Sequence, residues 1–320
     1  MTNLTCASFF AGVGGIEEGF KLAGFNTLYA NEIDKNASIT YRANFPDVEL
    51  SVKDIRIINE KTEIPDFDIM LAGFPCQAFS IAGYRQGFDD EKGRGNLFFE
   101  LTRIIKEKKP SVVFLENVKN LISHDKGNTF ITITNELDKL GYHVKSSVLN
   151  SAFFGDVPQS RERIYIVCFR DEEKFRKFDF PNPIKPEKTL KDVIDFENRQ
   201  DEKYYYTSSC YFYKELVDAV IHSNTCYQWR RVYVRENKSN LCPTLTANMG
   251  TGGHNVPIIR TSHGEIRKLT PKECFNLQGF PDSFILPEKL SNGALYKQAG
   301  NSVSVSVIKR IAEEIKKAFE

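Results

Sequence analysis

A cysteine at position 76 combines a nucleophilic residue type with a local sequence that exposes it. It lies in the run Gly73-Phe74-Pro75-Cys76-Gln77, directly after the apolar segment 69–72. A thiol just beyond a strand end, in a turn that proline makes rigid, is accessible and can be reactive. A free cysteine is more often a buried structural thiol, so this run alone leaves both interpretations open.

Acidic and basic groups adjoin two other apolar segments. Glu116 follows the segment 112–115, where a carboxyl group can hydrogen-bond the edge of a heterocycle. Arg161 and Arg163 precede the segment 164–168 and, being two residues apart, share one face of an extended chain. They suit contact with a phosphate or a base. Solvated surface charges are the alternative for all three residues.

A glycine-rich turn, residues 9–15, follows the apolar segment 4–10 and opens an amphipathic stretch at 15–23. Its glycines allow a ligand to approach the backbone, and the start of a helix offers free N–H groups. Glu32 directly follows the segment 27–31, a position at which an acid typically binds ribose hydroxyls. Asp54 could accept a hydrogen bond from an adenine amino group. The glycine order is not that of dinucleotide sites, so an adenosine-containing cofactor other than a nicotinamide is favoured. A plain strand-to-helix turn is the alternative.

These residues fall at the ends of alternating strands and helices. The strands are predicted at 4–10, 27–31, 69–72, 112–115 and 164–168, and the helices at 15–23, 97–107 and 130–140. Strands separated by helices predict an α/β fold, with a parallel sheet and helices on both of its faces. Chemistry in such folds collects at the carboxyl ends of the strands.

The composition changes near residue 171, where the chain becomes charged and proline-broken. Residues 200–265 are rich in Tyr, Ser, Asn and Gly, with short β-prone pieces such as Arg231-Val232-Tyr233-Val234. Helical periodicity returns at 270–277, where Thr270 and Glu273 form a capping box, and at 303–318, which Gly300-Asn301-Ser302 would open. We predict a first domain of residues 1–178 and 284–320, and a second of residues 179–283.

Composition limits the cellular setting and the partners. The seven cysteines are odd in number and include no CxxC pair, which disfavours both a disulfide framework and a structural zinc site and indicates a reducing compartment. The chain has no 18-residue apolar window, so neither a signal peptide nor a membrane span is predicted. The net charge is only +1, but residues 225–270 hold seven Lys and Arg against two Glu, which suits a phosphate backbone.

Taken in order, these runs resemble the motif set of DNA (cytosine-5-)-methyltransferases of the bacterial restriction-modification type. The set comprises the glycine turn, the acid, Pro-Cys-Gln, Glu-Asn-Val, Gln-x-Arg-x-Arg, Arg-x-Leu-Thr with Gln-Gly-Phe-Pro, and Gly-Asn-Ser-Val, across about residues 5–315. The resemblance implies a Rossmann-like, S-adenosylmethionine-dependent methyltransferase sheet. It also implies that the second, smaller and irregular domain is a target-recognition domain.

The resemblance assigns roles by position. Cys76 would attack carbon 6 of a flipped cytosine in a short duplex site. Glu116, Arg161 and Arg163 would hold the base while carbon 5 receives the methyl group. S-adenosyl-L-methionine, and its product S-adenosyl-L-homocysteine, would be bound by Phe10, Gly12, Val13, Gly14, Gly15, Glu32, Ile33, Asp54, Ile55, Pro75, Leu97, Asn301, Ser302 and Val303. Double-stranded DNA would be contacted by Gln77, Ser80, Arg230, Arg231, Arg235, Thr244, Gly252 and Gly253.

Further expectations concern the loop after Cys76 and the partners. Residues 81–96 hold four glycines and suit a lid over the substrate. We expect no metal, no membrane association, a monomer on DNA, a bacterial cytoplasmic location at the nucleoid and a possible restriction endonuclease that acts separately. One alternative is an RNA-directed family member, although its Cys-Phe-Thr signature is absent. Another is a catalytically silent DNA-binding regulator, against which the intact Pro-Cys-Gln and Glu-Asn-Val argue.

Overall fold

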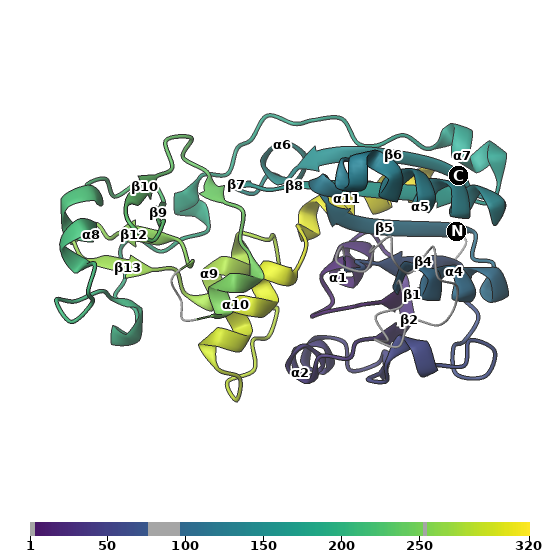
Figure 1. Ribbon diagram of the computed structural model, residues 1–320, viewed down its shortest axis with the longest axis horizontal. Coiled ribbons are helices and arrows are strands. Elements are labelled where there is room, and N and C mark those ends of the chain that lie inside the picture. The colour runs from purple at the N-terminus through teal and green to yellow at the C-terminus, as the bar shows by residue number, and fades with distance from the viewer. Residues whose placement is uncertain (1–3, 76–96, 252–254) are drawn as a thin grey trace. The chain divides into compact units, whose positions relative to one another are not determined.

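The computed structural model describes residues 4–75, 97–251 and 255–320, which form two compact units (Figure 1). The first unit draws on Met1–Leu149, Glu162–Pro181 and Ile308–Glu320, and the second on Asn150–Arg161 and Asn182–Val307. The predicted domains divide the chain at other residues, and they stay a prediction. Outside the described residues lie Cys76, Gln77, Ser80, Gly252, Gly253 and the expected lid at 81–96.

Among the described residues, the first unit contains a seven-stranded sheet (Figure 1). Its spatial order is β3 (Glu49–Ser51), β2 (Asn26–Asn31), β1 (Thr5–Phe9), β4 (Ile69–Ala72), β5 (Val112–Val118), β8 (Glu162–Phe169) and β6 (His143–Asn150). The strands from β3 to β5 pair in parallel, which confirms the predicted α/β class. β8 runs antiparallel to β5, so the sheet is mixed, as is common in large α/β sheets.

Helices cover both faces of this sheet. Side chains alternate between the two faces along each strand, so buried strands present apolar side chains on both faces. The elements are α1 (Gly15–Leu22), α2 (Lys35–Asn44), α4 (Leu97–Lys108), α5 (Asn128–Lys139), α7 (Glu172–Lys177) and α11 (Val305–Lys317), with the short turns η1 (Ile55–Ile57), η3 (Lys119–Leu121) and η4 (His124–Gly127). α4 and α5 pack on the face that carries Phe9 and Leu115. α1 packs on the other face, where the ring of Phe20 lies 5.3 Å from that of Phe114. The strands are therefore buried on both sides.

The second unit is built around a small antiparallel sheet of order β10 (Val234–Glu236), β9 (Tyr227–Trp229), β12 (Ile258–Arg260) and β13 (Ile266–Lys268). The remaining elements are α6 (Ser151–Gly155), β7 (Gln159–Ser160), α8 (Tyr213–Ala219), β11 (Cys242–Pro243), α9 (Pro271–Asn276), α10 (Asn292–Asn301) and the turns η5 (Leu190–Asp192), η6 (Glu202–Tyr204) and η7 (Ala247–Gly250). Trp229 stacks on Phe212 with ring centroids 4.4 Å apart and belongs to the core of this unit.

Three local predictions are tested by these elements. The capping box of Thr270 and Glu273 is present at the start of α9, as predicted. The run 231–234 is not a strand: Arg231 has a φ of 69° at the tip of the β9–β10 hairpin, and only Val234 enters β10. Gly300-Asn301-Ser302 closes α10 rather than opening the last helix, which begins at Val305. No helix in the described part of the chain has the length and apolarity needed to cross a membrane.

Glu17, in the first turn of α1, is a fully buried carboxyl group in the first unit. Burial raises its pKa to about 7, and the nearby charge of Glu32 adds to the shift. The hydroxyls of Ser8 on β1 and Tyr41 on α2 face the group and oppose the shift. The folded chain therefore favours the neutral carboxylic acid at this position.

We expect Glu17→Gln to remove a pH-dependent contribution to stability. An unfolded Glu17 ionises near its ordinary pKa of 4.5, whereas the folded one ionises near 7, so stability is lost as the pH rises between these values. From pH 5 to pH 8 the wild type should lose about 2–3 kcal/mol relative to the variant. Urea unfolding followed by circular dichroism measures this. A difference that does not change with pH contradicts the assignment, and the surface variant Glu172→Gln should follow the wild type.

Candidate active site

The turn between β1 and α1 lies against Glu32, which follows the end of β2. The N–H groups of Gly12 and Asp34 donate to the two carboxylate oxygens of Glu32, at 2.7 and 2.6 Å. Gly12 and Gly14 have φ values of 59° and 89°, and a Cβ added at Gly14 would overlap the ring of Phe45. Glycine is therefore required in this turn by backbone conformation and by the close approach of an aromatic ring.

The space beside Glu32 suits a hydroxyl-bearing ligand. A Cβ added at Gly12 would meet no atom of the described chain within 4 Å, so the turn borders open space. Burial raises the pKa of Glu32, while the N–H groups of Asp34 and Gly12 oppose the shift. A carboxylate offers about four acceptor positions, and backbone N–H groups of Gly12, Asp34 and Ile33 approach this one. Glu32 can therefore accept further hydrogen bonds, as from the hydroxyls of a ribose.

The other cofactor candidates of the first unit have varied surroundings. Asp54 caps η1 and accepts hydrogen bonds from the backbone and guanidinium of Arg56, which hold the pKa of Asp54 below its ordinary value. Ile33 is 60% exposed, whereas Ile55 is buried in the core. Phe10 and Leu97 are partly buried against the same core, Val13 is buried, Gly15 begins α1 and Pro75 is exposed.

The ends of β4 and β5 bring Glu116 beside the segment that leads into Cys76. Parallel pairing sets Ala72 opposite Leu115, and a Cβ added at Gly73 would lie 3.8 Å from a carboxylate oxygen of Glu116. The Nδ2 of Asn117 donates to the carbonyl of Phe74 at 2.9 Å in a buried position. β5 extends to Val118, so Glu116 lies within the strand and not beyond a strand end at residue 115. Asn117 was not among the predicted site residues, although its place in Glu-Asn-Val was a signal.

Arg163 joins this group from β8. Its Nε lies 3.3 Å from Oε1 of Glu116, and both side chains are largely buried. The antiparallel register sets Tyr165 opposite Glu116, so Arg163 is the diagonal neighbour of Glu116 on the same face. The structure thus brings together two of the predicted catalytic residues.

Arg161, by contrast, is committed to backbone carbonyls of the second unit. Its guanidinium is 2% exposed and donates to the carbonyls of Leu245 at 2.8 Å, Gly300 at 3.4 Å and Ser302. A Cβ added at Gly300 would overlap the backbone of Thr246, so the two segments touch. Among the predicted cofactor residues here, Asn301 is exposed, and Ser302 and Val303 are buried. The hydrogen bonds of Arg161 connect the segment around residue 245 to the segment 300–302. Its contact with a base stays a prediction.

Gln159 and Thr244 reinforce the same junction. The Nε2 of Gln159 donates to the carbonyl of Leu277 at 2.8 Å, and its Oε1 accepts from the N–H of Leu245 at 3.1 Å. The hydroxyl of Thr244 donates to the carbonyl of Ser160 at 2.6 Å. The first residue of Gln-x-Arg-x-Arg is therefore a bridging amide, which the sequence interpretation did not single out.

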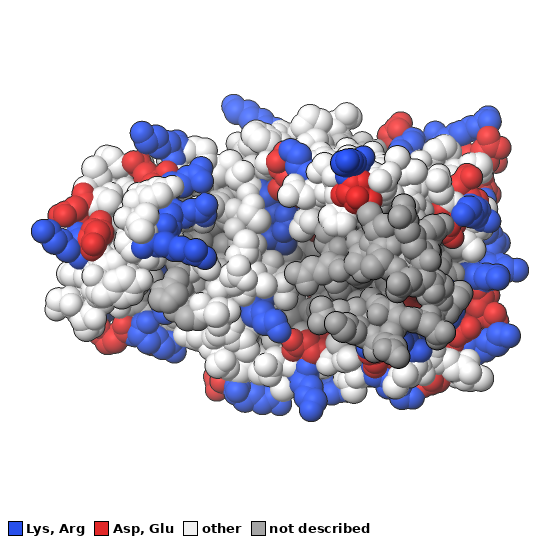
Figure 2. Space-filling model, in the orientation of Figure 1, with Lys and Arg blue, Asp and Glu red and all other residues white. Residues whose placement is uncertain are grey.

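The predicted DNA-contacting arginines lie on an exposed hairpin. Arg230, Arg231 and Arg235 are exposed, and the N–H of Arg230 donates to the carbonyl of Tyr233 at 2.8 Å to close the hairpin. Figure 2 shows Lys and Arg side chains gathered on the second unit over β9 and β10. Val232 at the tip is 82% exposed. The hairpin thus presents positive charge around two exposed hydrophobic side chains, Val232 and Tyr233.

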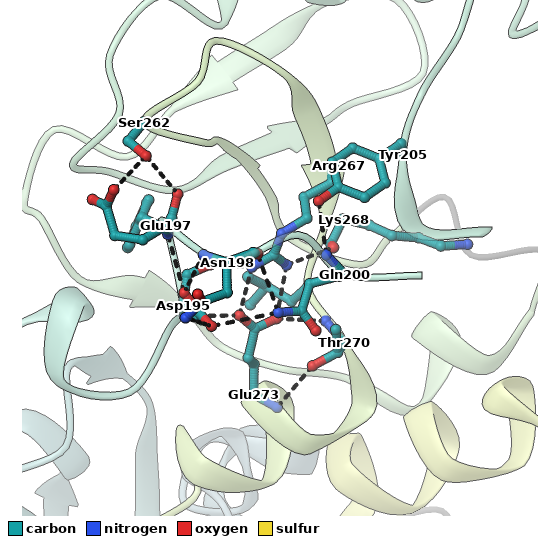
Figure 3. A network of polar contacts seen from close by, with 12 residues as sticks. Asp195, Glu197, Asn198, Gln200, Tyr205, Ser262, Arg267, Lys268, Thr270 and Glu273 are labelled. Atoms are coloured by element: carbon teal, nitrogen blue, oxygen red, sulfur yellow. Dashed lines mark hydrogen bonds and ion pairs between the residues drawn. The ribbon is translucent and has the colours of Figure 1, made fainter. Parts of the chain in front are cut away.

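Arg267 does not belong to the basic surface in which its charge was counted. It is 0% exposed and forms a bidentate pair with Glu273, at 2.8 and 2.7 Å (Figure 3). It also donates to the carbonyls of Asp195 and Lys268. Glu273 accepts in addition from the N–H groups of Asp195 and Thr270, so this pair joins β13, α9 and the segment before η6.

Comparisons with known proteins agree with this architecture. Residues 4–317 match the family model of C-5 cytosine-specific DNA methylases. The chain is 59% identical to the type II methyltransferase M.Bsp6I of Bacillus sp. (strain RFL6), across 99% of both chains. It is 38% identical to the type II methyltransferase M.HhaI of Haemophilus parahaemolyticus, across 98% of this chain and 95% of the relative.

Solved structures support the fold at low sequence identity. A mutant of Spodoptera frugiperda DNMT2 superposes with a TM-score of 0.75 at 23% identity, across 99% of this chain and 100% of that one. The Entamoeba histolytica methyltransferase EhMeth also gives 0.75, at 20% identity and across the full length of both chains. Family model, relatives and fold agree, and the chain belongs to the C-5 cytosine-specific DNA methylase family. It is a DNA (cytosine-5-)-methyltransferase.

The buried pair of Arg267 and Glu273 gives a prediction for the second unit. Glu273→Ala would leave the guanidinium buried without its carboxylate, which should lower the free energy of unfolding by about 3–5 kcal/mol. Trp229 is the only tryptophan of the chain and lies in the core of this unit, so its fluorescence during urea unfolding reports the change. Glu202→Ala, which breaks the exposed pair with Arg199, should have a much smaller effect, because solvent screens this pair. Equal effects of the two substitutions would contradict the role of burial.

Proposed function

We propose that this enzyme transfers a methyl group from S-adenosylmethionine to carbon 5 of a cytosine flipped out of a short specific duplex site, through a covalent Cys76 adduct at carbon 6. The observation that carries the proposal is the carboxylate of Glu116 beside Gly73, with Asn117 fixing Phe74. These contacts hold Gly73 and Phe74, which precede Cys76 in the chain, next to a carboxyl group that can hydrogen-bond the edge of a base.

The residues around the glycine turn fit S-adenosylmethionine. Glu32 would accept the ribose hydroxyls, Gly12 and Gly14 would allow close approach, and Asp54 would accept from the adenine amino group while keeping Arg56 as a partner. Phe10, Val13, Gly15, Ile33, Ile55, Pro75, Leu97, Asn301, Ser302 and Val303 complete the proposed set. When bound, the cofactor supplies an electrophilic methyl group on a sulfonium.

The chemistry requires a thiolate and a proton partner for the ring. Carbon 5 of cytosine is a poor nucleophile, and attack of the Cys76 thiolate on carbon 6 turns the ring into an enamine. Glu116 would share a proton with ring N3 as charge develops, with Arg163 holding its carboxylate. Once carbon 5 carries the methyl group, its remaining hydrogen passes as a proton to solvent, the C5–H electrons re-form the double bond between carbons 5 and 6, and sulfur leaves carbon 6 as the Cys76 thiolate. Arg161 would act on the base only in addition to its observed carbonyl contacts.

The second unit would recognise the DNA. Arg230, Arg231 and Arg235 would bind phosphates or base edges, Thr244 a phosphate at the flipped nucleotide, and Gly252, Gly253, Gln77 and Ser80 the target site. The curated relatives reported above carry the name type II methyltransferase, which supports a protective methylase beside a separate restriction endonuclease. We propose further that the enzyme acts as a monomer in the bacterial cytoplasm, at the nucleoid.

Trapping with 5-fluorocytosine tests the covalent step. DNA that the expressed enzyme modifies is first located by bisulfite sequencing, and the same site is then synthesised with 5-fluorocytosine. Fluorine cannot leave as a proton does, so we expect a stable complex with wild type and none with Cys76→Ala, which should still bind the site in a gel shift. Cys210→Ser, a substitution of a free cysteine in the second unit, should trap normally. A complex with Cys76→Ala, or activity on transfer RNA instead of DNA, would refute the proposal.

Calorimetry with S-adenosylhomocysteine tests Glu32. Glu32→Ala should raise the dissociation constant about tenfold, equivalent to about 1.4 kcal/mol. Because the pKa of Glu32 is raised, its carboxylate takes up a proton at a higher pH than an ordinary Glu as the pH falls. Wild-type affinity should therefore begin to weaken, as the pH falls from neutral, at a higher pH than an ordinary Glu would give, and that of Glu32→Ala should not change in this way. Glu49→Ala, at the exposed start of β3, serves as the control, and wild-type affinity in Glu32→Ala would exclude the assignment.

A further inference from the structure

Arg103, in the middle of α4, contacts the irregular segment that follows β3. Its Nη2 donates to the carbonyl of Ile55 at 2.9 Å, and its Nη1 to the carbonyl of Ile58 at 3.1 Å. The same guanidinium pairs with Glu60 and, through Nε, with Glu100 at 2.9 Å. One side chain thus joins a helix to a segment more than 40 residues away in sequence.

This segment has little other regular support. β3 is three residues long, and η1 is a single turn that begins directly after Asp54. The side chains of Ile55 and Ile58 are buried in the core, and the carbonyl of Ile55 accepts one long hydrogen bond from the N–H of Ile58, at 3.4 Å. Arg103 supplies donors to both carbonyls, so it determines how the backbone of η1 faces α4.

The two elements that Arg103 joins carry proposed cofactor residues. Asp54 and Ile55 lie at the start of η1, and Leu97 is the first residue of α4, six residues before Arg103. Arg103 itself makes four contacts within the protein and is 31% exposed on its side chain. Its guanidinium therefore connects these two elements through contacts within the protein.

We propose that Arg103 is a positioning residue that sets the width of the adenine side of the cofactor pocket, between Asp54 and Ile55 at the start of η1 and Leu97 at the start of α4. The inference rests on the cofactor pocket proposed above. It predicts a selective effect on the cofactor: the affinity for S-adenosylmethionine depends on Arg103, whereas turnover at saturating cofactor and the KM for DNA do not.

The test compares Arg103→Met, Arg103→Lys and Arg170→Met in the full-length enzyme. Arg170 is a matched control, because it is an exposed arginine whose Nη1 donates to the carbonyl of Lys109 at 2.6 Å, beyond the opposite end of α4. Arg103→Met should raise the dissociation constant for S-adenosylhomocysteine and the KM for S-adenosylmethionine about tenfold, with kcat within about twofold. Arg103→Lys keeps the charge but not the planar fork, so it should give a smaller increase, and Arg170→Met none.

The outcomes separate this inference from the proposed function. Failure of wild type to bind S-adenosylhomocysteine would remove the pocket itself, and the inference with it. Wild-type cofactor affinity in Arg103→Met would overturn only the inference, as would a fall of kcat and DNA affinity in parallel with cofactor affinity. If Arg103→Met does not fold, Arg103→Lys decides: a severalfold higher dissociation constant supports the positioning role, and an unchanged one overturns it.

Discussion

The parallel register of β4 and β5 is the constraint on which the active site depends. Pairing of Ala72 with Leu115 requires that the next residues of the two strands, Gly73 and Glu116, also lie side by side. The hydrogen bond from Asn117 to the carbonyl of Phe74 extends this pairing beyond the sheet. A shift of one residue would turn Glu116 to the opposite face, because side chains alternate along a strand. The pairing of the two strands therefore positions the carboxyl group of Glu116 beside Gly73.

Local sequence patterns predicted most of the first unit. The strands at 69–72 and 27–31 and the helices at 15–23 and 97–107 were found within a residue or two, because each has a clear apolar period and a turn at its end. The glycine turn and Glu32 were also brought together as expected. The antiparallel direction of β8 was not predictable, since direction is set by pairing with β5 and not by β8's own composition.

Charged residues show where sequence interpretation reaches its limit. Arg163 and Arg161 are two positions apart, yet one pairs with Glu116 and the other donates to carbonyls of residues 245–302. Arg267 looked like surface charge and is wholly buried. Whether an arginine binds a ligand or forms internal hydrogen bonds depends on carboxylates and carbonyls that lie far away in sequence. For the same reason, the basic character of residues 225–270 is smaller at the surface than the count of charges suggests.

The contacts of Arg161 have a consequence for synthesis of the chain. Its acceptors lie 84, 139 and 141 residues downstream, and Gln159 reaches the carbonyl of residue 277, 118 positions away. While the ribosome is still translating, the guanidinium of Arg161 has emerged long before the carbonyls of residues 300 and 302. The first unit also waits for its final helix, since it includes Ile308–Glu320. Both units therefore reach their final form only after residues beyond 300 have left the exit tunnel, so a nascent chain acquires its activity in one late step.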